Sequence, residues 1–80
     1  MRPVVAREVS RAEFVAFWSL LMMRRCGDYR GVAVRFDRTE QTGRNWLDGV
    51  ACPTGYDVAR AQLWWPEDFA ALCCDLRRVA

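Results

Sequence analysis

The spacing of apolar residues along this chain predicts helices, because they recur every three or four positions and no useful run alternates at every second position. Ser10 and Glu13 have the spacing of a capping box, so the first helix is expected to follow Ser10, to reach about Arg25 and to stop near Gly27. Its apolar residues form one face with a wide margin: Phe14, Phe17, Trp18 and Leu21 on the face, and Val15, Leu20, Met22 and Met23 beside it. A surface this broad predicts a central helix, or one partly buried against another subunit.

A second, short helix is expected over residues 29–36, with Asp28 as its cap. The three-and-four spacing gives it an inward face of Val32, Ala33 and Phe36. Asp37 and Arg38 then form a tight break, because aspartate tolerates the left-handed backbone conformation.

A third helix is expected over residues 40–48, with Thr39 as its cap and Gly49 as its stop. Gly43 and Trp46 would face the interior. Glycine inside a helix costs roughly 1 kcal/mol in propensity, although it permits closer packing against a neighbour.

Two more helices are expected after a loop that contains Pro53. The fourth spans residues 55–63, with Val58 and Leu63 inward. The fifth begins at Pro66, because a proline followed by acidic residues suits the first turn of a helix. Its apolar stripe consists of Phe69, Leu72, Cys73 and Leu76.

These elements predict an all-α fold, a compact bundle of about five short helices in a single domain of residues 1–80. The apolar fraction of 52% is ample for a core, although 80 residues lie near the lower limit for one. Residues 1–9 are expected to form a flexible arm.

Charge is distributed unevenly along the chain, although the net charge is only +2. All twelve basic residues are arginine, and residues 24–44 hold six of them against three acids. Residues 45–80 hold three arginines against five acids. A basic middle is typical of a phosphate-binding face, and also occurs on ordinary solvated surfaces.

Several functional classes are disfavoured by what the sequence contains. With no histidine and with cysteines at 26, 52, 73 and 74, no metal site and no disulfide framework is expected. No catalytic nucleophile with its base and no phosphate-binding glycine loop is evident, so we expect no enzyme and no cofactor. The apolar run at 14–23 is too short to span a bilayer, and no signal peptide is apparent, so a cytoplasmic location is expected.

Residues 28–61 resemble the helix-turn-helix of the phage repressor and Cro-like DNA-binding family. The polar cap, apolar residue, small alanine and large residue of its first motif helix correspond to Asp28, Val32, Ala33 and Phe36. A Trp-x-x-Gly-x-x-x-Pro tail follows at Trp46, Gly49 and Pro53, and Val58 and Ala61 continue the pattern. This sequence departs from the family at the turn glycine, at the next apolar position and within the recognition helix, where it has Asp37, Arg38 and Gly43.

The resemblance implies that residues 28–49 form the motif and that helix 40–48 enters the major groove of double-stranded DNA. The outward residues would contact bases: Glu40, Gln41, Arg44 and Asn45. The phosphate contacts would be Arg30, Arg35, Arg38, Thr39 and Thr42. The alternative is that Gln41, Arg44 and Asn45 form a solvated helix face and that Thr39 is only a cap.

The function expected on this basis is sequence-specific DNA binding by a small, phage-like transcriptional regulator. A homodimer or a contact with the transcription machinery would use the 14–23 helix, Trp64 and Trp65, or the stripe at 69–76. The alternatives are a helical protein-interaction module, in which the spacing is coincidental, and the DNA-recognition subunit of a phage-like packaging or replication assembly.

Overall fold

Five helices, joined by connections of one to seven residues, make up the computed structural model, which describes the backbone of residues 10–79 and the side chains of residues 10–72. The helices are α1 (Arg11–Cys26), α2 (Tyr29–Phe36), α3 (Glu40–Leu47), α4 (Gly55–Trp64) and α5 (Pro66–Val79). Residues 10–79 contain no strand, so the all-α prediction is confirmed. The expected arm at 1–9 and the side chains of Cys73 and Leu76 lie outside the described residues.

Polar caps define the beginning of α1 as the sequence predicted. The Glu13 N–H donates to Ser10 Oγ, and the Ser10 N–H donates to Glu13 Oε1, both at 3.1 Å. At the other end, Gly27 has a φ of 89°, and its N–H donates to the Met23 carbonyl. The capping box and the glycine stop are therefore confirmed.

The connection between α2 and α3 is three residues long. The Asp28 carboxylate caps α2 by accepting from the Gly31 N–H at 2.8 Å, and Thr39 caps α3. Between them, Asp37 has the left-handed conformation that the sequence predicted, with φ 56° and ψ 51°. At its other end, α3 stops at Leu47, one residue earlier than the sequence predicted.

The closest approach of α3 to α2 is at Gly43, which is buried. A β-carbon at Gly43 would collide with the carbonyl oxygen of Tyr29, the first residue of α2. Glycine is therefore required there by packing, and the close packing offsets its low helix propensity.

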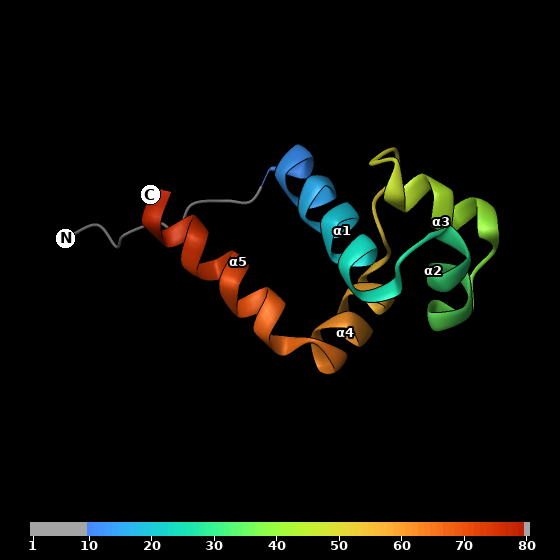
Figure 1. The fold of residues 1–80 in the computed structure, drawn as a ribbon. Coiled ribbons are helices and arrows are strands. Elements are labelled where there is room, and N and C mark those ends of the chain that lie inside the picture. Colours follow the sequence, from blue (N-terminus) through green and yellow to red (C-terminus); the bar gives the residue numbers. More distant parts are fainter. Residues whose placement is uncertain (1–9, 80) are drawn as a thin grey trace.

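Three aromatic side chains from three helices form the centre of the core. Trp18 on α1, Phe36 on α2 and Trp46 on α3 are nearly or fully buried and contact one another edge to face, with ring centroids 5.2 to 5.8 Å apart. Burial of such large side chains dominates the stability of a small core. In Figure 1, α1 lies between α5 on one side and the α2–α3 pair on the other.

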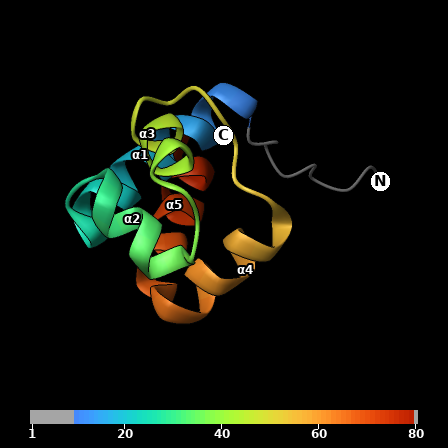
Figure 2. The ribbon, with the colours of Figure 1, turned by 90° about the vertical axis from the view of Figure 1, so that its right-hand side faces the viewer.

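The last two helices add less to this core. From α4, Ala61 is fully buried, while Trp64 packs against Phe36 with ring centroids 5.2 Å apart. On α5, Phe69 meets Phe17 edge to face at 5.2 Å. Figure 2 shows the connection before α4 as a long arc on the outside of the bundle. Among the helices described here, none combines the length and the apolarity needed to cross a lipid bilayer.

The predicted inward position of Leu63 is wrong, because this side chain is 82% exposed. On α4, Asp57 and Ala61 are buried and Trp64 is half-buried, and these three positions follow the helical spacing of four and then three residues. This spacing places Leu63 on the side away from the core, and α4 continues one residue past the expected end to include Trp64. Val58 is half-buried and packs against the core, as expected.

Candidate nucleic-acid interface

The outward side of α3 carries the four residues that the sequence proposed as base contacts. We call this set the α3 outer face: Glu40, Gln41, Arg44 and Asn45. The first three are exposed, Asn45 is half-buried, and Gly43 and Trp46 are buried on the opposite side of the helix. Successive residues of a helix are rotated by about 100°. When Gly43 and Trp46 face inward, this rotation directs the α3 outer face away from the core.

Two amides on the α3 outer face are joined to each other. Gln41 Nε2 donates a hydrogen bond to Asn45 Oδ1 at 3.0 Å. This bond leaves the Gln41 carbonyl oxygen, its second amide hydrogen and the Asn45 amide nitrogen available. Gln41 therefore keeps one donor and one acceptor, the pair that an adenine edge requires in the major groove.

Arg44 lies against an aromatic ring at the start of α2. Its guanidinium carbon is 4.0 Å from the centroid of the Tyr29 ring, and the guanidinium carbon of Arg30 is 5.6 Å from the same centroid. Within the part of the chain that the structure describes, neither arginine has a carboxylate within 4.0 Å. Both positive charges are therefore uncompensated and exposed.

Arg38, which the sequence proposed as a phosphate contact, is paired with a buried carboxylate, while 35% of its own side chain remains exposed. Its Nη2 lies 2.7 Å from Asp57 Oδ2 and its Nε 3.3 Å from Asp57 Oδ1. Asp57 is 1% exposed, so its charge requires a fixed cationic partner. Arg38 therefore has a structural role as the partner of Asp57, and its contact with phosphate stays a prediction.

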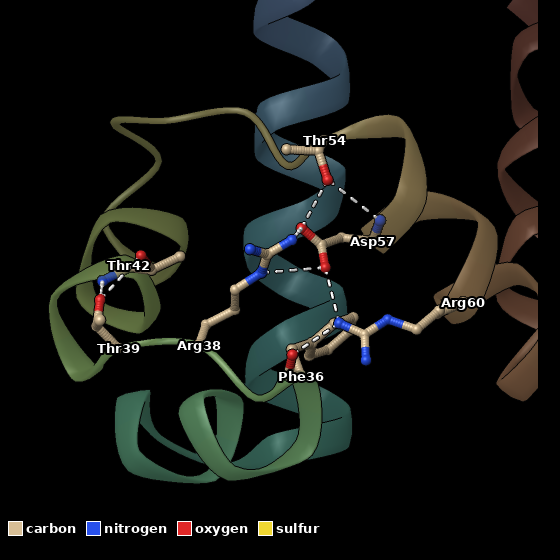
Figure 3. A network of polar contacts seen from close by, with 7 residues as sticks. All are labelled: Phe36, Arg38, Thr39, Thr42, Thr54, Asp57 and Arg60. Atoms are coloured by element: carbon tan, nitrogen blue, oxygen red, sulfur yellow. Dashed lines mark hydrogen bonds and ion pairs between the residues drawn. The ribbon is translucent and has the colours of Figure 1, made fainter.

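Asp57 is the centre of a polar network that links the α2–α3 connection to α4 (Figure 3). The Asp57 network consists of Arg38, Thr54, Asp57 and Arg60. Arg60 Nη2 donates to Asp57 Oδ1 at 2.9 Å and to the Phe36 carbonyl at 2.7 Å. Thr54 Oγ1 donates to Asp57 Oδ2 at 2.9 Å and accepts from the Asp57 N–H. Both guanidinium groups of the Asp57 network thus contact the same carboxylate, while the buried Nε of Arg60 has no hydrogen-bond partner among the described residues.

The Asp57 carboxyl is ionised because of these contacts. Burial by itself raises the pKa of Asp57, but the hydrogen bonds from Arg60, Arg38 and Thr54 outweigh it and hold the pKa below its usual value. Sequence reasoning missed Asp57 and Arg60. Two signals could have found them: the Thr54-x-x-Asp57 capping pattern, and the presence of Arg38 where the resembling family has an apolar residue.

Thr39 and Thr42 lie at the start of α3 (Figure 3), and Thr42 lines a hollow together with Arg38, Thr54 and Asp57. The Thr42 N–H donates to Thr39 Oγ1 at 3.1 Å, and the two hydroxyl oxygens are 3.0 Å apart. The hydroxyl of Thr39 therefore acts as a helix cap. The first N–H groups of α3 have no partner within the helix, which suits an anion such as a phosphate.

Arg30 and Arg35 lie on α2 and line one shallow hollow with Arg25, at the corner between α1 and α2. Arg25 is paired with the buried carboxylate of Asp68 at 2.8 Å. Arg35 has no carboxylate partner among the described residues, and its guanidinium carbon lies 4.4 Å from the Trp64 ring centroid. This hollow therefore has an excess of positive charge beside the α2–α3 pair.

Comparison of the chain with protein-family models, with curated proteins and with solved structures gives no match.

Of the surfaces that the sequence suggested for protein partners, α1 is the more exposed. Leu20 and Met23 are 67% and 54% exposed, and a hollow between α1 and α5 adjoins Leu20. Trp64 and Trp65 are half-buried, and their rings lie 5.2 and 6.0 Å from that of Phe36. The tryptophan pair is thus mainly part of the core.

Proposed function

We propose that this protein binds double-stranded DNA in a sequence-specific way, with α3 in the major groove, and acts as a small transcriptional regulator. One observation carries the proposal. The α3 outer face is exposed and polar, whereas the opposite side of the same helix is fixed to α2 by Gly43 and to the core by Trp46. A rigid helix that presents several hydrogen-bonding side chains outward is what base recognition in the major groove requires.

The residues of the α3 outer face have donors and acceptors that match base edges. Arg44 would donate to the two acceptors of a guanine, and Gln41 or Asn45 would pair with an adenine. Glu40 would accept from a cytosine amino group. The uncompensated charge of Arg44 supports this assignment, because no intramolecular carboxylate among the described residues competes for it.

Phosphate contacts would flank the bases. Thr39 and Thr42 would act with the first N–H groups of α3, and Arg30 and Arg35 would act through their free charges. One such unit reads a few base pairs, so useful specificity requires a second copy or another regulator on the DNA. The resemblance of residues 28–61 to phage repressors supports a phage-like regulator.

Selection from a pool of random duplex DNA, followed by sequencing, tests the proposal. We expect an enriched motif for the parent protein and loss of preference at one base pair for Arg44→Ala. Arg30→Ala and Arg35→Ala should weaken binding to all sequences and reduce the slope of log affinity against log salt by about 1 each. Arg24→Ala is the matched control, because Arg24 is an exposed arginine that pairs with Asp68 of α5.

Salt-dependent binding without an enriched motif would contradict sequence reading by α3. If the protein binds no DNA even at low salt, DNA binding is excluded as its function. That second result would favour the alternative of a protein-interaction module, for which the exposed Leu20 and Met23 on α1 are the supporting observation. Assembly into rings would instead favour the packaging or replication alternative.

A further inference from the structure

Tyr29, the first residue of α2, lies directly beneath Arg44, although nothing in the sequence suggested a role for it. We propose that Tyr29 is a positioning residue that determines specificity, because its ring holds the Arg44 guanidinium in the orientation that reads a base. This inference rests on the proposed function, which it deepens by identifying how Arg44 is held.

The geometry of the pair suits this role. The guanidinium carbon of Arg44 is 4.0 Å from the Tyr29 ring centroid, within the range of a cation–π contact. A ring occupies one face of the flat guanidinium, whereas its N–H donors point outward within the plane. A guanidinium that stacks on the Tyr29 ring would keep its donor edge free for a bidentate contact with guanine.

The backbone that carries the ring is held close to α3. The carbonyl of Tyr29 lies so close to Gly43 that a β-carbon there would collide with it, and Gly43 is the residue before Arg44. Asp28 fixes the start of α2 from the other side by capping it at the Gly31 N–H. The ring and the arginine thus belong to one rigid junction between the two helices.

No other described side chain competes for Arg44. Glu40 lies four residues earlier on the same helix, a spacing that permits an ion pair, yet it forms none with Arg44. The Arg30 guanidinium lies farther from the ring, at 5.6 Å, and lines the hollow at the α1–α2 corner. The ring therefore orders Arg44 in preference to Arg30.

A guanidinium that is ordered before binding loses less conformational freedom when it contacts a base. Removing the ring should therefore reduce discrimination at the base pair that Arg44 reads. We expect a loss of about two- to fivefold, the range that an exposed cation–π contact corresponds to. Binding to unrelated sequences should not change, because the charge of Arg44 remains.

The experiment compares Tyr29→Phe, which keeps a ring, with Tyr29→Leu, which keeps apolar bulk but has no ring. Each is made alone and together with Arg44→Ala, and affinities are measured for the selected DNA site, for that site with the Arg44 base pair changed, and for unrelated duplex. Thermal unfolding checks that each variant is folded. If Tyr29→Leu is not folded, Tyr29→Gln replaces it.

The inference is supported if Tyr29→Phe keeps the preference, Tyr29→Leu loses it at that base pair alone, and neither has a further effect in the Arg44→Ala background. It is overturned if Tyr29→Leu discriminates as well as the parent. It is also overturned if Tyr29→Leu weakens binding equally for all sequences and lowers the salt slope, since Arg44 would then be a phosphate contact. Failure of the proposed function is distinct, because the parent itself would then show no preference.

Discussion

The arginines on the two sides of the α2–α3 pair differ in what surrounds them. On the side that faces α4, Arg38 and Arg60 are paired with the buried Asp57, and the carboxylate also accepts from Thr54. On the side of the α3 outer face, Arg44 and Arg30 share only the ring of Tyr29. The comparison separates charges that hold the fold together from charges that are available to a ligand.

The difference matters because six arginines in residues 24–44 are equivalent in a count of charge. Arg25 and Arg38 are paired with buried carboxylates, and Arg24 lies 3.5 Å from one of them. Arg30, Arg35 and Arg44 have no such partner among the described residues. The basic middle of the chain is thus half structural, and its phosphate-binding capacity is smaller than its net charge suggests.

The comparison predicts that the largest loss of stability follows from removing the carboxylate of the Asp57 network. Asp57→Asn should lower the free energy of unfolding by about 2–3 kcal/mol, because it leaves two arginines without their anion in a partly buried site. Urea unfolding at neutral pH measures this change. Asp48→Asn, at an exposed carboxylate that ends α3, is the control and should change stability by less than about 0.5 kcal/mol. Equal effects of the two variants would contradict a structural role for Asp57.

The next largest loss of stability is expected for Gly43→Ala, because the added methyl group collides with the Tyr29 carbonyl. Helix propensity alone would favour alanine by about 1 kcal/mol, but the collision forces α2 and α3 apart and should give a net loss of about 1–3 kcal/mol. The matched control is Gly55→Ala, because a β-carbon at Gly55 meets nothing within 4 Å. Urea unfolding of both variants decides whether the close approach is required; a stable Gly43→Ala would show that the junction can relax.

The pH dependence of stability offers a subtler test of the Asp57 network. The folded pKa of Asp57 lies below the unfolded value of about 3.9. Its contribution is therefore complete above that unfolded value and is lost as the pH falls through the folded pKa. The free energy of unfolding, measured in urea from pH 7 down to pH 3, should thus decline more steeply below about pH 4 in the parent than in Asp57→Asn. If the free energy of unfolding falls equally with pH in the parent and in Asp57→Asn, the ionised form of Asp57 does not stabilise the fold.

Local chemistry explains why much of the fold was predictable. Ser10, Asp28 and Thr39 each cap a helix through a side chain that reaches an N–H within three residues, so the boundaries follow from short stretches of sequence. The left-handed conformation of Asp37 follows from its own side chain and the break around it. The exposure of the α3 outer face follows from the helical period, once Gly43 and Trp46 face inward.

Tertiary contacts explain what the sequence did not reveal. Arg38 and Asp57 are 19 residues apart, and their pairing depends on how the long connection after α3 brings α4 beneath the α2–α3 turn. Such pairings depend on the geometry of the whole bundle.

The smallest effect on stability is expected at Arg44, and it gives the sharpest contrast with Arg38. Arg44→Ala should change the free energy of unfolding by less than about 0.5 kcal/mol, because this exposed side chain satisfies no buried group. Arg38→Ala should lower it by about 1–2 kcal/mol, because Asp57 then keeps only Arg60 and Thr54 as partners. In DNA binding we expect the opposite order, with the larger effect for Arg44→Ala. Folded Arg38→Ala should keep the sequence preference of the parent, while Arg44→Ala loses it at one base pair. Urea unfolding and competition binding on the same samples measure both quantities, and a lost preference in Arg38→Ala alone would invert the assignment of the two arginines.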